Sequence, residues 1–232
     1  MLRGWLWTVG ALGLLGATAQ TASAAAVLEL FTSQGCNDCP PADTLLGEFA
    51  RVPGVVALAY HVTYWDALGW HDRFGLPQAD ELQQYYVKQL RLPAAFTPQA
   101  VIDGRVSVIG SDRRAISTAL GSSGGTIPVA LALSHDTVGI ELSAQSLSMP
   151  VNVILVSYLP QATTKVGAGE NAGRMLEEFD VVRSYEVIGV WRGNATHFTV
   201  PLSSLPPEAT RVAVLLRRPA GVITGVATLA VR

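Results

Sequence analysis

Cysteine is scarce in this sequence of 232 residues: there are two, Cys36 and Cys39, three positions apart. Disulfides usually stabilise a fold by linking distant segments, and a pair this close cannot do so. By the chain-entropy relation, so short a loop removes only about 2 kcal/mol of unfolded-state entropy, less than half the value of a 100-residue loop. The pair is therefore better suited to chemistry than to holding the chain together.

Charge is also sparse, at 15% of residues, and the formal net charge is only −2. No run of basic residues stands out, so nucleic acid and anionic membrane surfaces are poor candidates as partners. Beyond the first residues, no apolar stretch reaches the roughly 20 residues that a transmembrane helix takes. The apolar fraction of 49% is ample for a buried core, and the length allows one large domain or two small ones.

The N-terminus has the pattern of a cleaved signal peptide. Arg3 supplies a positive charge, residues 5–17 are almost wholly apolar, and Ala22-Ser23-Ala24 has the small-x-small pattern that signal peptidase recognises. An apolar run of about 13 residues is short for a bilayer, which disfavours an uncleaved anchor. We therefore expect a signal peptide at 1–24, cleaved after Ala24, and a periplasmic or secreted protein without membrane contact afterwards.

The first half alternates strand and helix patterns. Residues 27–31 and 55–60 are apolar or β-branched strands, and between them a helix is expected to begin at Cys36, with two prolines in its first turn. This is a βαβ unit. A helix at 79–90, a hairpin at 99–103 and 106–109, and a last helix at 113–120 capped by Asp112 follow.

The second half changes character at a linker-like segment, 121–125, which is rich in glycine and serine. Turn residues separate the segments beyond it, and helical periodicity is nearly absent. We predict an antiparallel β-sandwich-like domain over 126–232. Its expected strands are 129–133, 138–142, 151–158, 181–190, 198–202, 212–216 and 222–230.

A Cys-x-x-Cys pair also occurs in zinc sites, but these usually need a second pair of ligands, which the sequence lacks. Here the motif follows a buried strand, and Thr97-Pro98 precedes a hairpin about sixty residues later. This order resembles that of thioredoxin-like proteins, in which a cis-proline faces the dithiol. The resemblance implies a thioredoxin-like α/β domain over 25–122, with Thr97, Pro98 and Trp65 shaping a substrate groove.

The chemistry of such a pair is thiol–disulfide exchange. A cysteine at a helix N-terminus meets free N–H groups and the positive end of the helix dipole, which favour the thiolate. Cys36 would then be the nucleophile and Cys39 the resolving thiol. The negative Asp38 opposes a Cys36 thiolate, so we expect a couple nearer the reducing end of the range.

Glu29 lies in an apolar strand, where it is either buried or at an edge. If buried, it is suited to move a proton for Cys39. Thioredoxins that resemble this domain carry an acid six residues before the first cysteine, whereas the spacing here is seven, which places Glu29 on the other sheet face unless the loop absorbs one residue. Proton shuttle and structural hydrogen-bond partner are both left open.

Histidines offer a metal-binding alternative. His61 ends the second strand, and His71 lies in an aromatic segment with Asp66 and Asp72. A copper or zinc site shared with the cysteines is one hypothesis. Hydrogen-bonded or exposed histidines lining a groove are the favoured interpretation, so we expect no bound metal and no cofactor.

Several strings carry a closer resemblance. The chain resembles an exported bacterial family called domain of unknown function 1223, within the thioredoxin-like superfamily, and the match extends over essentially the whole mature chain. The resemblance implies a fold, a compartment and a dithiol, but no substrate. Its strings are LELFTSQGC (28–36), CPPAD (39–43), YWD (64–66), FTPQ (96–99), GENAGR (169–174) and VVR (181–183).

The turn at 171–174 has two interpretations. It either packs near the dithiol, with Arg174 facing an acid, or it is a turn with an interdomain salt bridge. The second interpretation is favoured.

Three functions compete. The leading one is an exported thiol–disulfide oxidoreductase that acts on protein thiols or disulfides and depends on a redox donor not yet known. The second is a non-catalytic binding or scaffold protein. The third is a copper- or zinc-handling protein that uses Cys36, Cys39 and His61.

Overall fold

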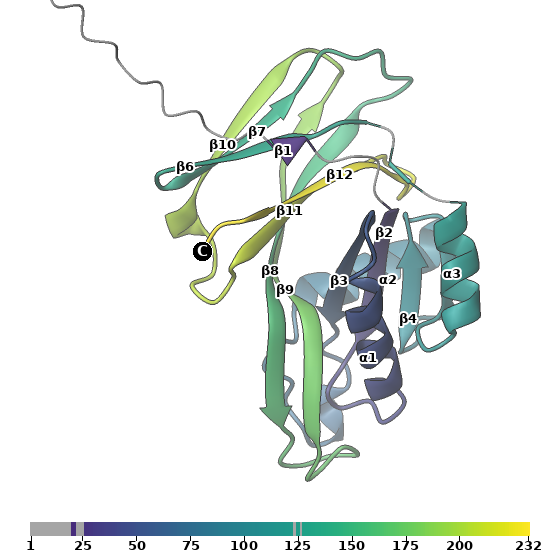
Figure 1. Ribbon diagram of the computed structural model, residues 1–232. Helices are drawn as coiled ribbons and strands as arrows, with labels where there is room; N and C mark the ends of the chain where they lie inside the picture. The colour runs from purple at the N-terminus through teal and green to yellow at the C-terminus, as the bar shows by residue number, and fades with distance from the viewer. Residues whose placement is uncertain (1–19, 22–25, 123, 126) are drawn as a thin grey trace, which may run out of the picture.

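The computed structural model describes residues 20–21, 26–122, 124–125 and 127–232 (Figure 1). The signal peptide expected at 1–24 lies outside the described residues, except for the two-residue strand β1 (Gln20–Thr21). The expected linker at 121–125 includes residue 123, which also lies outside them. No helix in the described part is both long and apolar enough to cross a membrane.

The first half contains the elements that its patterns predict. Strands β2 and β3 are parallel and are connected by α1. Strands β4 and β5 form the antiparallel hairpin beside β2. Asp112 caps α3 by accepting the N–H of Ala115 at 2.9 Å, as the sequence predicts. The elements are β2 (Ala26–Thr32), α1 (Pro40–Phe49), β3 (Val55–His61), the 3₁₀ turn η1 (Asp66–Leu68), α2 (Pro77–Gln89), β4 (Gln99–Ile102), β5 (Val106–Ile109) and α3 (Arg113–Gly121).

The second half is a series of strands, of which two are unusually long. Strands β8 and β9 pair in an antiparallel hairpin that runs much of the length of the molecule (Figure 1). The elements are β6 (Ala130–Ser134), β7 (Thr137–Leu142), β8 (Val151–Lys165), β9 (Met175–Trp191), β10 (Thr196–Pro201), the 3₁₀ turn η2 (Leu202–Ser204), β11 (Arg211–Arg217) and β12 (Ile223–Ala230).

The predicted fold class, a thioredoxin-like α/β domain followed by an antiparallel β-sandwich-like domain, is wrong. One mixed sheet of eight strands runs through both halves in the order β12-β11-β8-β9-β3-β2-β4-β5. The two halves join where β3 pairs in parallel with β9, at Ala59 and Val181. This pairing gives hydrogen-bond partners to backbone N–H and C=O groups that would be unpaired if β3 were an edge strand. A second sheet has the order β1-β6-β7-β10, and the described residues contain only three α-helices.

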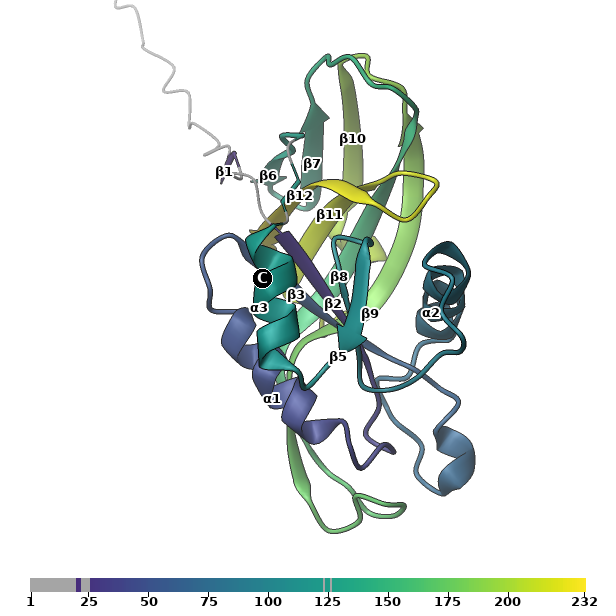
Figure 2. The same ribbon diagram turned by 90° about the vertical axis from the view of Figure 1, so that its right-hand side faces the viewer.

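Helices cover both faces of the β3-β2-β4-β5 end of the large sheet. Helices α1 and α3 lie on one face, packed on the Leu28 and Leu30 side of β2, and α2 lies on the opposite face (Figure 2). The four-stranded sheet covers the other end of the large sheet, where its side chains pack against those of β8, β11 and β12. One cluster of the core contains buried side chains from both halves of the chain.

Candidate functional site

The two cysteines form a disulfide in the loop that follows β2, with their Cα atoms 5.4 Å apart. Strands β2 and β3 are parallel, so this loop and the aromatic segment after β3 meet at the same edge of the sheet, where ligands and catalytic groups gather in α/β sheets. Cys36 and Cys39 are 1% and 0% exposed. Asn37 and Asp38 between them are exposed, so the middle of the motif meets solvent while its two cysteines do not.

The helix after the motif begins later than predicted. Cys39 is the N-cap of α1 and the first helical residues are Pro40 and Pro41, so the prediction that Cys36 opens the helix is wrong. Proline has no N–H, and the N–H groups of Ala42 and Asp43 donate to the carbonyl of Cys39 at 2.8 and 3.1 Å. The first turn therefore leaves few free donors to stabilise a Cys36 thiolate.

A buried polar cluster lies at the same sheet edge, and its centre is a histidine–aspartate pair. The Nδ1 atom of His61 is 2.7 Å from Oδ2 of Asp72. Burial opposes the charge on His61, but the Asp72 carboxylate, together with Glu178 and Asp43, outweighs it and raises the pKa of His61 to about 9. Burial likewise opposes ionisation of Asp72, but His61 and the N–H groups of Gln34 and Phe74 together hold the pKa of Asp72 below its usual value.

Two more acids complete this cluster, which we define as Asp43, His61, Asp72 and Glu178. Asp43 lies in the first turn of α1 and accepts a hydrogen bond from the hydroxyl of Thr32 at 2.7 Å. Its complete burial raises its pKa to about 7, which neighbouring His61 only partly offsets. Burial also raises the pKa of Glu178. Asp43 is thus a group near the dithiol that can gain or lose a proton at neutral pH.

Asp43 is directly linked to the dithiol through the backbone. It is four residues after Cys39, and its N–H donates to the Cys39 carbonyl. Side chains four apart at the start of a helix lie on the same side of it, and both of these are buried. The sequence reasoning missed Asp43, although its spacing from Cys39 was the signal available.

Distant segments cover the motif. The side chain of Asn171, in the β8–β9 loop, donates to the carbonyls of Gln34 and Cys36, each at 2.9 Å. The indole N–H of Trp70 donates to the Gln34 side chain at 2.9 Å. Arg174 donates to Oδ1 of Asn171 at 2.7 Å. The 171–174 turn therefore packs on the dithiol loop, which is the interpretation that the sequence did not favour, and Arg174 contacts an amide there and not an acid.

The predicted groove residues lie beside the motif loop. The Thr97–Pro98 peptide bond is cis. The indole N–H of Trp65 donates to the hydroxyl of Thr97 at 2.8 Å. Trp65 also packs against Gly35, where an added Cβ would lie 3.1 Å from the Cβ of Trp65. Trp65 thus connects the motif loop with the Thr97–Pro98 segment.

Glu29 lies on the other face of the sheet, as its spacing from the cysteine suggested. One oxygen of its carboxylate accepts from Nη2 of Arg217 at 2.7 Å, and the other accepts from the hydroxyl of Tyr86, which belongs to α2. Helix α1 packs on the opposite face. Glu29 thus has the hydrogen-bond partners of a structural residue.

The metal-binding hypothesis receives no support from the geometry. His61 pairs with Asp72, and His71 pairs with Asp66 at 2.7 Å on the surface. Within the ranges that the structure describes, no three His, Cys, Asp or Glu side chains are placed to hold one metal ion.

Access to the disulfide should be controlled by Asn171. Replacing it with alanine leaves the carbonyls of Gln34 and Cys36 without their donor, so we expect the bond to be reduced about tenfold faster, the equivalent of about 1.4 kcal/mol in loop opening. Thiol labelling after timed exposure to dithiothreitol measures this rate. The control is Asn194→Ala, in the exposed β9–β10 turn, which should react like the unaltered protein. Equal rates for all three would show that the turn does not limit access.

Two comparisons with known proteins match most of the chain. The model of a family described as "protein of unknown function (DUF1223)" matches residues 27–217. A crystal structure of a protein from Agrobacterium tumefaciens is similar at 30% identity, with a TM-score of 0.79, over 91% of this chain and 96% of that one. That similarity spans both halves and agrees with the mostly-β architecture.

Other comparisons add little. An endonuclease/exonuclease/phosphatase from Beutenbergia cavernae is similar at 16% identity over 49% of this chain and 24% of that one, but its TM-score of 0.21 is too low to indicate a shared fold. No curated protein matches the sequence.

Proposed function

The chain belongs to the DUF1223 family of proteins of unknown function, and we propose that it exchanges disulfides with other proteins through Cys36 and Cys39. The observation that supports this most directly is the placement of the disulfide one helical turn before Asp43, a buried acid with a pKa of about 7. Acids tuned to neutral pH by burial are common at sites of proton transfer. A purely structural disulfide does not need one.

The proposed exchange begins when a partner thiolate attacks Sγ of Cys36. The Cys36–Cys39 bond breaks, and its electron pair leaves on Sγ of Cys39, which takes a proton from Asp43. A second partner thiol, deprotonated by solvent, then attacks the partner's own sulfur in the mixed disulfide and releases Cys36. The partner has lost two electrons, which the dithiol now carries, and the reverse sequence reduces a partner disulfide.

The residues of the site have distinct roles in this proposal. Cys36 is attacked first because a loop holds it, whereas Cys39 is fixed as the N-cap of α1. Pro98, Thr97 and Trp65 line the approach of the partner. We assign the proton role to Asp43 in preference to Glu29, since Glu29 is paired with Arg217 on the other face of the sheet.

We further propose that this exchange takes place outside the cytoplasm. The N-terminal sequence pattern at 1–24 supports export. Exported proteins also meet the oxidising conditions in which disulfides persist. Their thiols and disulfides are the proposed partners, together with a redox donor of the same compartment.

Serine variants of the two cysteines test the proposal. We expect Cys36→Ser to abolish exchange with a disulfide-bonded model peptide, and the reduced Cys39→Ser protein to accumulate a mixed disulfide through Cys36, seen by mass spectrometry. Asn194→Ala, in the exposed β9–β10 turn, is the control and should retain the exchange rate. Undiminished exchange by Cys36→Ser would contradict the proposal.

The unaltered protein, which keeps both cysteines, gives the reduction potential in glutathione and dithiothreitol buffers. Few helix N–H groups are free and Asp38 is adjacent, so the thiolate form should be weakly stabilised. We therefore expect a potential near that of reducing dithiol proteins, about −270 mV, and not near the value of about −120 mV of strong oxidants.

A non-catalytic binding protein is the second candidate, because both cysteines are almost completely buried. In that case the disulfide only shapes the loop. A double variant, Cys36→Ser with Cys39→Ser, that restores the cellular phenotype of a deletion strain as well as the unaltered protein would favour this candidate over exchange.

A further inference from the structure

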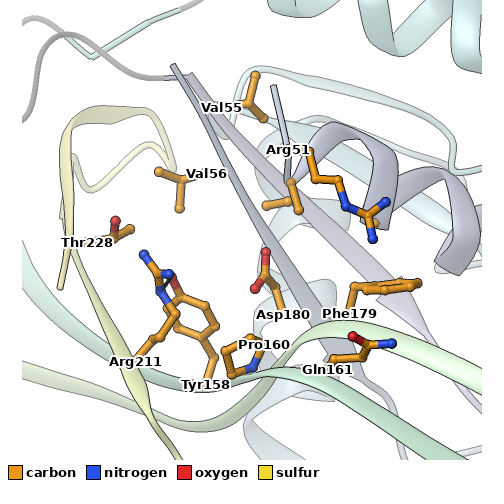
Figure 3. Close-up of a pocket in the computed structure, with 13 residues that line it drawn as sticks. Arg51, Val55, Val56, Tyr158, Pro160, Gln161, Phe179, Asp180, Arg211 and Thr228 are labelled. Atoms are coloured by element: carbon orange, nitrogen blue, oxygen red, sulfur yellow. Dashed lines mark hydrogen bonds between the residues drawn. The ribbon is translucent and has the colours of Figure 1, made fainter. Parts of the chain in front are cut away.

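A hollow lies away from the cysteines, between the C-terminal end of α1 and the strands of the large sheet. It has a volume of about 280 Å³, and its walls come from α1, β3, β8, β9, β11 and β12 (Figure 3). Gly47 lets the ring of Phe179 pack directly against α1, because a Cβ there would lie 2.4 Å from that ring. Apolar side chains, among them Val56 and Phe179, share the lining with three charged ones, Arg51, Asp180 and Arg211.

Aromatic rings hold both arginines in place. The guanidinium carbon of Arg51 lies 5.5 Å from the ring centroid of Phe179. Arg211 donates from Nε to the hydroxyl of Tyr158 at 3.1 Å, and its guanidinium carbon lies 5.9 Å from that ring centroid. The terminal N–H groups of both side chains form no hydrogen bond with any other described residue. Both side chains thus place N–H donors at the hollow that have no hydrogen-bond partner among the described residues.

Asp180 is drawn between the two guanidinium groups (Figure 3). It has a φ of 46°, a conformation that is uncommon for residues other than glycine. Leu159 pairs with Val181 and Gln161 with Phe179, so Asp180 lies opposite Pro160, which has no N–H to pair with it. Residues held in such conformations cluster at ligand sites. Its carboxyl forms no hydrogen bond or ion pair within the described part of the chain.

The electrostatics of the hollow favour an anion. Burial raises the pKa of Asp180 to about 7, and the nearby Arg211 offsets this only in part. Near neutral pH, two guanidinium charges therefore face one carboxyl that is ionised only part of the time. The hollow has a net positive charge, and that charge grows as the pH falls.

We propose that this hollow binds a small organic carboxylate, with its anionic group held by Arg51 and Arg211 and its short apolar body against Phe179 and Val56. Arginine is suited to this because its planar fork of donors matches the two oxygens of a carboxylate. A protonated Asp180 donates a further hydrogen bond to the anion. The inference uses none of the residues proposed for disulfide exchange, and either can fail without the other.

Benzoate is the probe, with the neutral benzamide and the cationic benzylamine as matched compounds. Two-dimensional NMR titration of the full chain should show saturable shifts for benzoate in α1 and β9, with a dissociation constant in the millimolar range or tighter. Benzamide and benzylamine should bind at least about tenfold more weakly. Tighter binding of benzylamine would show that Asp180 selects a cation and would overturn the proposal.

Three variants assign the site. Arg51→Gln and Arg211→Gln should each weaken benzoate binding about tenfold, whereas Arg105→Gln, in the exposed β4–β5 turn, should leave it unchanged. Arg51 is exposed at the surface, so this variant still tests the proposal if Arg211→Gln folds poorly. Binding that both pocket variants retain in full, or no saturable binding of benzoate up to about 20 mM at pH 6, would overturn the proposal.

The pH profile identifies Asp180. The other groups that face it are Arg51 from the turn after α1, Arg211 from β11 and Tyr158 from β8, and none of these residue types titrates between pH 6 and 8. Lowering the pH from 8 to 6 should tighten benzoate binding about tenfold, as Asp180 becomes protonated. Asp180→Asn keeps a residue that tolerates the backbone conformation and should bind with one affinity throughout. A variant that retains the pH dependence would contradict this role.

Discussion

Replacing Glu29 with glutamine should lower the free energy of unfolding by about 3 to 5 kcal/mol, as expected when one partner of a buried ion pair is removed. The side chains of Glu29 and Arg217 are 0% and 3% exposed, and their charged atoms are 2.7 Å apart. Arg217 also donates to the hydroxyl of Tyr185 at 2.7 Å, and its guanidinium carbon lies 5.4 Å from the ring centroid of Tyr86. Without the Glu29 carboxylate, a buried guanidinium charge is left with only neutral partners.

The matched control for this variant is an ion pair on the surface. Arg183 and Glu208 are 3.0 Å apart, with Glu208 45% exposed, so Glu208→Gln should cost less than about 1 kcal/mol. Urea unfolding measures both. The double variant Glu29→Gln, Arg217→Met removes both buried charges and should be more stable than Glu29→Gln alone. A loss for Glu29→Gln no larger than for Glu208→Gln would show that the pair does not stabilise the fold.

The Glu29–Arg217 pair also shows why the predicted fold was wrong. Glu29 belongs to the first half of the chain and Arg217 to the second, 188 residues later, so the two halves share a buried polar contact as well as a sheet. Local patterns predicted most elements of the first half, because the β2–α1–β3 unit and the β4–β5 hairpin depend on neighbours in sequence. The pairing of Ala59 with Val181 joins residues that are far apart in the sequence, so no local pattern of residues predicts it.

The length of the central hairpin was missed for a related reason. The prediction ended one strand at 158, just before Pro160, and began the next at 181, just after Asp180. In the structure, β8 continues to Lys165 and β9 begins at Met175. Proline usually excludes a strand interior, but here it lies opposite a residue with positive φ. Pro160 and Asp180, which made the strands look shorter in the sequence, also line the hollow between α1 and the large sheet.

The candidate site was predictable in part. The spacing of the cysteines identified the dithiol, and the Asn171 turn was recognised as a motif although its preferred interpretation was different. The His61–Asp72 pair and Glu178 meet under the motif only through the pairing of β3 with β9, so their proximity could not be predicted. Asp43 was within reach, because helical spacing alone places it beside Cys39.

Asp43→Asn should remove much of the pH dependence of folding stability between pH 4 and pH 7. The pKa of Asp43 is about 7 in the folded protein and 3.8 in the unfolded reference, so the folded state binds more protons in this range. The contribution of Asp43 to the free energy of unfolding is therefore fully present below about pH 4, and it is lost as the pH rises through 7. A shift of this size corresponds to about 2 to 4 kcal/mol, and urea unfolding across this range should show a correspondingly flatter profile for the variant.

His61 adds a loss of the same sign at higher pH. Its folded pKa of about 9 lies above the reference of 6.5, so its contribution is present below pH 6.5 and is lost as the pH rises through 9. Asp43→Asn should retain this second loss. A profile for Asp43→Asn that still falls by the full amount between pH 4 and 7 would show that Asp43 ionises freely in the folded state.

Asp180→Asn is the matched control for Asp43→Asn, because it removes a half-buried acid that lies away from the dithiol. Burial raises the pKa of Asp180 to about 7 as well, so both variants should flatten the stability profile over the same range. Of these two acids, only Asp43 has a backbone hydrogen bond to the carbonyl of Cys39. Asp43→Asn should therefore also change the pH dependence of thiol exchange, whereas Asp180→Asn should leave it as it is. Equal changes in exchange for both variants would mean that Asp43 acts through stability alone and moves no proton for Cys39.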